Sequence, residues 1–244
     1  MPNNEAIVNP QKTKNSPDIG PVAVMAATQP DLTYLSDLFH FSKGDFQRLF
    51  LSSLYFDKNN PGGPSVTGPF VGAPYAVMLL ENLIAWGARQ VIFIGWCGAI
   101  ADPVNIGDII LPTSIHPDEG TSRHYGAGDS LPLQLTFPLV TEVRQVLNEK
   151  EKDYHEGAVW TTDAVYRETR KEVAVHQQNG ILAVEMEFSA LASVARFRGV
   201  DLAGLLVVSD ELSSLKWRPG FKLEQFIQSR RAVCRLIKEI VDNL

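Results

Sequence analysis

Cysteine and charge are scarce in this chain of 244 residues, and each shortage excludes a class of protein. Its two cysteines, Cys97 and Cys234, are too few for a disulfide framework or a zinc pattern, so we expect a reducing compartment. Charged residues make up 20%, below the roughly 25% of an average soluble domain. The net charge of −6 argues against a protein that binds nucleic-acid phosphates.

Long apolar runs, metal-ligand spacings and a dinucleotide fingerprint are missing too. The apolar runs fall far short of the roughly 20 residues of a membrane span, and residues 1–18 contain no apolar stretch typical of a secretory signal. The sequence has no G-x-G-x-x-G, and its five histidines show no paired spacing. We therefore expect a cytoplasmic protein that binds no metal, no nucleic acid and no membrane.

What remains is a regular alternation of short apolar runs with amphipathic stretches. Residues 1–19 are predicted to be a flexible lead-in, and residues 20–244 a single domain. The apolar runs predict strands at 21–27, 90–94, 108–111, 158–160, 183–186 and 202–208. The amphipathic stretches predict helices at 76–86, 139–148, 187–198 and 223–241, with a loop at 59–72. Apolar strands separated by helices predict an α/β sandwich, in which ligands bind beyond the carboxyl ends of strands.

The first strand end of interest runs into Gly95, Trp96, Cys97 and Gly98. Glycines there let the backbone turn tightly and bring amides close to an anion or a sugar. An ordinary strand-to-loop turn explains the same residues. The spacing is not that of a nucleophile elbow, because Ala99 stands where that motif requires glycine.

Two further strand ends carry carboxylates. At Glu185-Met186-Glu187, a carboxylate beside the chain turn can accept two hydrogen bonds from the vicinal hydroxyls of a ribose, although Glu187 also suits a helix N-terminus. Asp210, after the apolar run 202–208, can act as a proton donor at the mouth of that strand, or as a helix N-cap. Trp217 fits a lid over a ligand, but a core position is the more common role.

Read together, these strand ends resemble the nucleoside phosphorylase family, which includes uridine phosphorylase, purine nucleoside phosphorylase and methylthioadenosine nucleosidase. The matching text is IGWCGAI, NIGDIILP, EGTSRHY, WTTDAVYRET, AVEMEFSAL and VVSDEL, from about residue 21 to the end. The resemblance implies a single-domain, three-layer α/β sandwich with a mixed central sheet. It also implies a homo-oligomer, a dimer, trimer or hexamer, with its sites at subunit contacts. It implies a pentosyltransferase that cleaves the N-glycosidic bond of a small-molecule nucleoside, with inorganic phosphate as co-substrate and no cofactor.

Matched position by position, the resemblance assigns roles to the residues. Met186 and Glu187 correspond to the ribose-binding pair, with Glu185 before them on the base side. Asp210 corresponds to the aspartate that protonates a departing purine. Val165 falls where the family stacks the base on a phenylalanine.

Other matched positions bear on the base and the nucleophile. Tyr166 beside Val165 is a candidate to take over the stacking, and Gly95 to Gly98 lie on the nucleophile side. Thr169 and Lys171 replace the glutamine and arginine that uridine phosphorylases use. A purine-like base is therefore favoured.

Four departures from the family leave the nucleophile open. Phe93 and Trp96 stand where phosphorylases have a phosphate-binding arginine and a hydroxyl residue, and the segment AATQPDL lacks the second arginine. Where nucleosidases have a water-activating glutamate, the chain has Pro30, with Asp31 beside it.

Four hypotheses remain open. The first is a phosphorylase in which Arg123 or Arg218 replaces the missing cations. The second is a nucleosidase that uses water, and the third is a nucleoside- or base-binding protein with degenerate catalysis. A fourth, a hydrolase built on Cys97, Asp163 and His176, is disfavoured by the elbow spacing.

Overall fold

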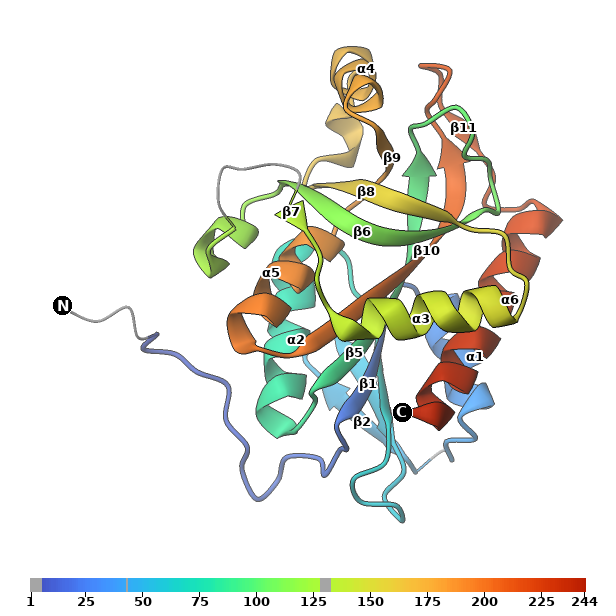
Figure 1. Cartoon of the computed structure of the whole chain (residues 1–244). Coiled ribbons are helices and arrows are strands. Elements are labelled where there is room, and N and C mark those ends of the chain that lie inside the picture. Colours follow the sequence, from blue (N-terminus) through green and yellow to red (C-terminus); the bar gives the residue numbers. More distant parts are fainter. Residues whose placement is uncertain (1–5, 43, 128–132) are drawn as a thin grey trace.

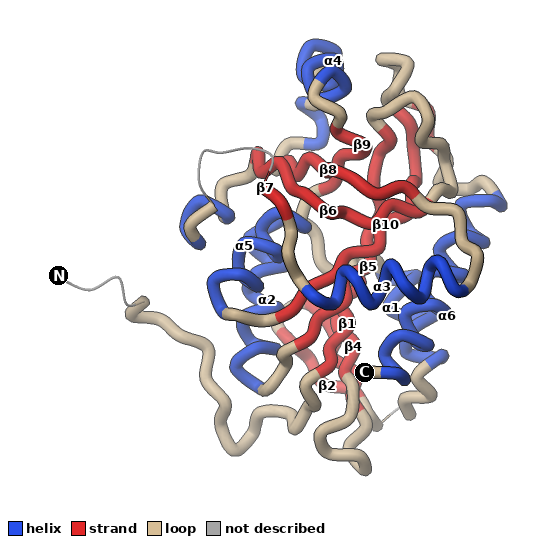
Figure 2. Tube along the Cα trace, in the orientation of Figure 1, coloured by secondary structure: helices blue, strands red, loops and turns tan. Residues whose placement is uncertain are grey.

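A mixed β-sheet runs through the protein, with helices on both of its sides (Figures 1 and 2). The structure, a computed structural model, describes residues 6–42, 44–127 and 133–244. Its strands are β1 (Val22–Ala26), β2 (Phe46–Leu49), β3 (Ser52–Phe56), β4 (Ser65–Gly68), β5 (Gln90–Ala99), β6 (Ile109–Asp118), β7 (Leu133–Gln134), β8 (His155–Thr162), β9 (Ile181–Glu185), β10 (Asp201–Glu211) and β11 (Arg218–Pro219).

The helices fall into two pairs and two single elements. They are α1 (Gln29–Leu38), α2 (Ala73–Trp86), α3 (Pro138–Glu149), α4 (Arg170–Gln178), α5 (Phe188–Arg198) and α6 (Glu224–Asn243), with short 3-10 turns η1 (Ser122–Tyr125) and η2 (Val165–Arg167). Helix α2 packs on α5, and α1 packs on α6, on opposite sides of the sheet (Figure 1). No helix within the described ranges has the length and apolarity needed to cross a membrane.

The sheet closes on itself at one end. Its strand order is β11-β10-β6-β8-β9-β5-β1-β4-β3-β2, and β10 also pairs with β5. Strands β10, β6, β8, β9 and β5 therefore form a small ring, a closure that leaves these strands without free edges. The long strands β5 and β10 are parallel and pair along most of their length, with a register shift between Val208 and Asp210. The α/β class and the mixed central sheet are confirmed, whereas this closure was not predicted.

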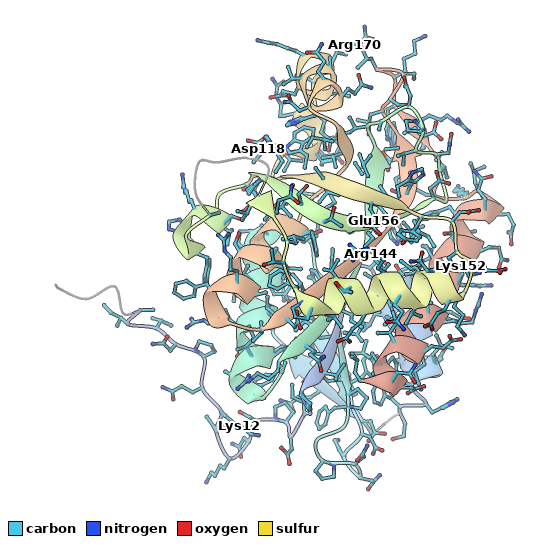
Figure 3. The ribbon with its side chains drawn as sticks, in the orientation of Figure 1. Lys12, Asp118, Arg144, Lys152, Glu156 and Arg170 are labelled. Atoms are coloured by element: carbon cyan, nitrogen blue, oxygen red, sulfur yellow. The ribbon has the colours of Figure 1, made fainter. Side chains whose placement is uncertain are left out.

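Ion pairs between neighbouring elements hold the layers in register. Arg144 of α3 donates to both carboxylate oxygens of Glu156 on β8, at 2.8 and 3.0 Å (Figure 3). Arg198 at the end of α5 donates in the same bidentate way to Glu81 of α2, at 2.8 to 3.1 Å. Bidentate geometry makes such pairs directional as well as attractive.

Several predicted boundaries were wrong in a way that matters for the site. Strand β5 continues through Gly95 and Gly98 to Ala99, so these glycines do not form a turn. A Cβ on Gly95 would lie 2.6 Å from the ring of Phe93, and one on Gly98 would lie 2.6 Å from Leu212, so both glycines provide packing space. Likewise, Asp210 lies within β10 rather than after it.

Other boundaries differ in the first half of the chain and at the start of α5. The predicted loop 59–72 contains β4, and α5 begins one residue later than expected, at Phe188. Alternating or short strands such as β2 and β3 give a weak apolar signal, and the helix α1 was missed together with them.

Candidate active site

A cavity of about 810 Å³ opens at the carboxyl ends of β5, β9 and β10. This is where ligands bind in sheets of this kind. The residues that line it come from these strand ends, from the loops after β1 and β4, and from the segments 165–168 and 212–221. They are Ala27, Thr28, Phe70, Val71, Trp96, Cys97, Gly98, Val165, Tyr166, Glu168, Val184, Glu185, Met186, Glu187, Ser209, Asp210, Leu212, Trp217 and Phe221. All the predicted site residues except Gly95 are among them.

Glu185 is the residue that caps helix α5. Its Oε2 accepts hydrogen bonds from the backbone N–H groups of Glu187 and Phe188, both at 2.7 Å. Its Oε1 accepts from the hydroxyl of Thr161. Both oxygens are thus used to hold the strand-to-helix turn, which positions Glu187 at the cavity wall.

Glu187 is buried, and it lines the cavity. Its Oε1 accepts a hydrogen bond from the backbone N–H of Gly72, and it does not cap α5. Gly72 has φ of +85°, a conformation that favours glycine, so this N–H is directed by the turn before α2. Burial, and then the charge of Glu185, raises the pKa of Glu187 above its usual range. A hydrogen bond from a ligand hydroxyl would stabilise the ionised form of such a carboxyl.

Asp210 is held by two donors at the cavity wall. Its Oδ1 accepts from the hydroxyl of Ser209 at 2.6 Å, and its Oδ2 accepts from the indole N–H of Trp217 at 2.9 Å. Burial raises the pKa of Asp210, although both hydrogen bonds oppose that shift. A carboxyl fixed in this way, with its pKa moved toward neutrality, is suited to donate a proton to a bound group.

Three aromatic side chains and a valine form the rim of the cavity. Tyr166 is 98% exposed and Trp217 is 65% exposed, and Val165 and Phe221 lie beside them at the opening. Trp217 is therefore not a core residue, which corrects the expectation from sequence. It contacts Asp210 from the rim, in keeping with the lid that the sequence left as the less favoured alternative.

The side of the cavity expected to bind the nucleophile is apolar. Phe93 is fully buried and stacks on Phe188 with ring centres 5.8 Å apart, so its side chain is part of the core. The indole of Trp96 lines the cavity, and its N–H points back to Asp31 at 2.7 Å. Cys97 is buried, and burial raises the pKa of its thiol well above the usual value.

Asp31 is not placed to activate water, because its carboxylate is enclosed. It is 1% exposed and also accepts hydrogen bonds from Thr28 at 2.7 Å and from Arg230 at 2.8 Å. The guanidinium of Arg230 lies over the ring of Trp96, 5.1 Å from its centre, and so is packed behind that ring. Burial raises the pKa of Asp31, which these partners counteract.

The two arginines proposed to replace the missing cations do not line the cavity. Arg218 is exposed and pairs with Glu211 at 2.8 Å, and Arg123 is an exposed residue of η1. Among the residues that the structure describes, those lining the cavity include no lysine, arginine or histidine. They include four carboxylates instead. Nor do the described ranges hold a group of three metal-ligating side chains.

The alternative site at Cys97, Asp163 and His176 is not assembled. Asp163 accepts a hydrogen bond from the backbone of Gly120 at 2.9 Å. His176 stacks on Trp160, with ring centres 4.2 Å apart. Neither residue lines the cavity that Cys97 faces.

Sequence reasoning missed one acidic residue of the site. Glu168 lies directly after η2 and lines the cavity, whose described lining contains no cationic side chain. The resemblance to the family assigned no role to this position. Burial, and then the charge of Asp210, raises its pKa to about 7. Glu168 lies in the matched segment WTTDAVYRET, but no role was assigned to it from sequence, and its place at the cavity follows from the fold.

Comparison with known proteins gives one family. Residues 21–243 match the phosphorylase superfamily. The DeoD-type purine nucleoside phosphorylase of Myxococcus xanthus (strain DK1622) is 31% identical over 149 residues, 61% of this chain and 62% of that relative. The one from Bacillus thuringiensis (strain Al Hakam) is 32% identical over 149 residues, 61% of this chain and 63% of its own length. The matched part thus spans less than two thirds of these relatives.

Solved structures extend the likeness over nearly the whole chain. Uridine phosphorylase from Vibrio fischeri ES114 has a TM-score of 0.78 at 21% identity, covering 98% of this chain and 99% of that one. The 5′-methylthioadenosine/S-adenosylhomocysteine nucleosidase from Helicobacter pylori has a TM-score of 0.74 at 18% identity, covering 93% and 99%. At these identities the likeness establishes the fold, and the family match over residues 21–243 goes further: this chain belongs to the phosphorylase superfamily.

Proposed function

We propose that this protein cleaves the N-glycosidic bond of a purine-like nucleoside, as a phosphorylase-type pentosyltransferase. The observation that carries the proposal is the placement of Glu187 and Asp210 on one cavity at the carboxyl ends of β9 and β10. One is a buried acceptor for sugar hydroxyls, and the other is a fixed acid on the base side. The family match supports the same reaction class.

In the proposed reaction, Glu187 and Met186 hold the ribose, and Val165 and Tyr166 contact the base at the rim. The bond from C1′ to the base nitrogen breaks, and its electron pair leaves with the base. Asp210 gives that base a proton, which lowers the cost of the charge that develops on it. An oxygen of phosphate then bonds to C1′ to form ribose 1-phosphate.

Hydrolysis is a second candidate, and a specific observation favours it. Phosphate binds well where guanidinium or ammonium groups meet it, and no cationic side chain lines the cavity among the described residues. Phosphorolysis in this cavity would therefore call for a cation from outside this described lining, and we propose a second subunit as its source. With water as nucleophile, ribose forms instead and no such cation is required.

The products distinguish the two reactions. We expect base release from a panel of purine nucleosides to require added phosphate and to yield ribose 1-phosphate. Base release at the same rate without phosphate, with free ribose as product, would establish the hydrolase. Binding of a nucleoside by calorimetry with no release under either condition would leave the protein a binding module.

Assembly and location are part of the same proposal. We propose a homo-oligomer in which the apolar rim of the cavity is covered by a neighbouring subunit, because exposed aromatic groups at a site mouth are typical of interaction surfaces. Two free, buried thiols support a reducing, cytoplasmic location.

A further inference from the structure

The carboxylate of Asp31 is held by three donors that come from different parts of the fold. Its Oδ2 accepts hydrogen bonds from the hydroxyl of Thr28, just before α1, and from the indole N–H of Trp96 on β5, both at 2.7 Å. Its Oδ1 accepts from Nη1 of Arg230 on α6 at 2.8 Å, and the thiol of Cys234 lies 4.0 Å away. Hydroxyl, N–H and guanidinium groups are also the donors that phosphate oxygens receive from proteins.

These donors belong to the wall of the cavity on its nucleophile side. Thr28 and Trp96 both line the cavity. The guanidinium of Arg230 lies over the Trp96 ring, 5.1 Å from its centre, and Asp31 itself is 1% exposed. A cation thus lies directly behind the cavity wall, and the carboxylate of Asp31 neutralises it there.

Asp31 does not satisfy every donor of this group. The Nε atom of Arg230 is buried and has no hydrogen-bond partner among the described residues. Unpaired buried donors are uncommon and costly in folded proteins. A carboxylate has two oxygens, and Thr28 and Trp96 share one of them, which leaves a single oxygen for the guanidinium. A phosphate ion has four oxygens and commonly meets a guanidinium through two N–H groups, so it offers acceptors that Asp31 lacks.

We propose that Thr28, Trp96 and Arg230 form an anion subsite on the nucleophile side of the cavity, and that the chain's own carboxylate, Asp31, occupies it and excludes free phosphate. The subsite itself does not depend on the proposed function, and only its meaning for the nucleophile rests on that function. With Asp31 in place, Arg230 supplies no free positive charge to the cavity, so phosphate that reacts there is bound by other groups. Removal of the carboxylate converts the subsite into one that binds phosphate within a single chain.

Asp31→Ala tests the inference, because it removes the carboxylate and leaves both the three donors and the space that the carboxylate filled. We expect the midpoint of thermal unfolding of this variant to rise with added inorganic phosphate, measured against sodium chloride at equal ionic strength, since a ligand of the folded state stabilises it. The apparent affinity for phosphate should be about 10- to 100-fold tighter than that of wild type, the range of one hydrogen bond to a charged group.

Two controls separate the filling of the subsite from its charge. Asp31→Asn removes the charge but keeps the space filled, so it should respond to phosphate as wild type does. Asp31→Ala combined with Arg230→Met lacks the cation and should lose the response of Asp31→Ala. If Asp31→Ala is unfolded in chloride, Asp31→Ser replaces it in every comparison, because its hydroxyl can accept one of the three hydrogen bonds.

The outcomes separate this inference from the proposed function. Equal responses of wild type and Asp31→Ala, or a response that persists without Arg230 or that Asp31→Asn shares, would overturn the inference. These measurements need no substrate, so they decide it even if the protein cleaves no nucleoside and the proposed function fails. If wild type cleaves a purine nucleoside, the rate with phosphate relative to the rate without it should rise by at least about 10-fold in Asp31→Ala. An unchanged ratio would overturn the place of the subsite on the nucleophile side.

Discussion

Asp210 is fixed by Ser209 and Trp217, and this determines what its replacement should change. In Asp210→Asn the amide keeps the shape of the side chain but cannot supply the acidic proton. We expect kcat for a purine nucleoside to fall by about 10²- to 10⁴-fold, the usual contribution of a general acid.

The control for that substitution is a substrate whose leaving group needs no proton. With 4-nitrophenyl riboside, the same variant should retain most of its activity, because nitrophenolate leaves unaided. If both substrates lose activity equally, Asp210 acts in binding or in positioning rather than as the acid.

Glu168 gives a pH-dependent prediction for stability. Its pKa is about 7 in the folded protein against a usual 4.5, so between these values the unfolded chain releases a proton that the folded chain keeps. Stability from this group is complete below pH 4.5 and is lost as pH rises toward 7. Glu168→Gln removes this loss, so the variant should match wild type near pH 4 and be more stable above pH 7, by about 1–2 kcal/mol after allowance for partial exposure.

Thermal unfolding of both proteins from about pH 4 to about pH 8 measures this difference. Glu142→Gln, at an exposed glutamate of α3, serves as the control. Parallel curves for wild type and Glu168→Gln across the range would show that the carboxyl ionises equally in both states.

Among the elements, two bidentate Arg–Glu pairs form a natural comparison. Glu81 of the α2–α5 pair is 10% exposed, whereas Glu156 of the α3–β8 pair is 31% exposed. Removing the charge of a buried partner leaves an arginine uncompensated, but exposed pairs contribute little because water screens them.

We therefore expect Glu81→Gln to lower the free energy of unfolding by about 1–3 kcal/mol, and Glu156→Gln by less than about 1 kcal/mol. Urea denaturation at one protein concentration measures both. Equal losses would mean that burial does not set the strength of these pairs in this fold.

The elements also show how far sequence reasoning reaches. Sequence patterns predict the strands β1, β5 and β10 and the helices α2 and α6, because the burial of these elements is continuous or periodic. The same patterns do not predict where the strands β5 and β10 end. The strand β5 continues through Gly95 and Gly98 because its neighbours β9 and β10 pair with it there, and a non-local pairing leaves no local signal.

The site also contains some features that local motifs predict and others that depend on the fold. Met186, Glu187 and Asp210 line the cavity as predicted, because they stand in motifs near strand ends. The capping role of Glu185, the enclosure of Asp31 and the exposure of Trp217 depend on how the chain folds around each residue. No local pattern encodes those surroundings.

At the scale of the whole molecule, the low charged fraction and the apolar rim are the features that support the proposed assembly. Tyr166, Val71 and Trp217 border one cavity and are 98%, 70% and 65% exposed in the single chain. Apolar groups gathered at one opening gain free energy when a partner covers them. In the proposed assembly, a neighbouring subunit at the rim could place a cationic side chain in the cavity, whose described lining has none.

We expect sedimentation equilibrium to give a mass at least twice the 27.0 kDa of the chain. Tyr166→Glu places a charge on the rim, so it should shift the protein toward monomer and lower its activity with phosphate together. Phe197→Glu is the control, since Phe197 is 57% exposed on α5 and does not line the cavity. A wild-type protein that sediments as a 27.0 kDa monomer while it performs phosphorolysis would contradict the assembly, because the phosphate would then be bound by one chain alone.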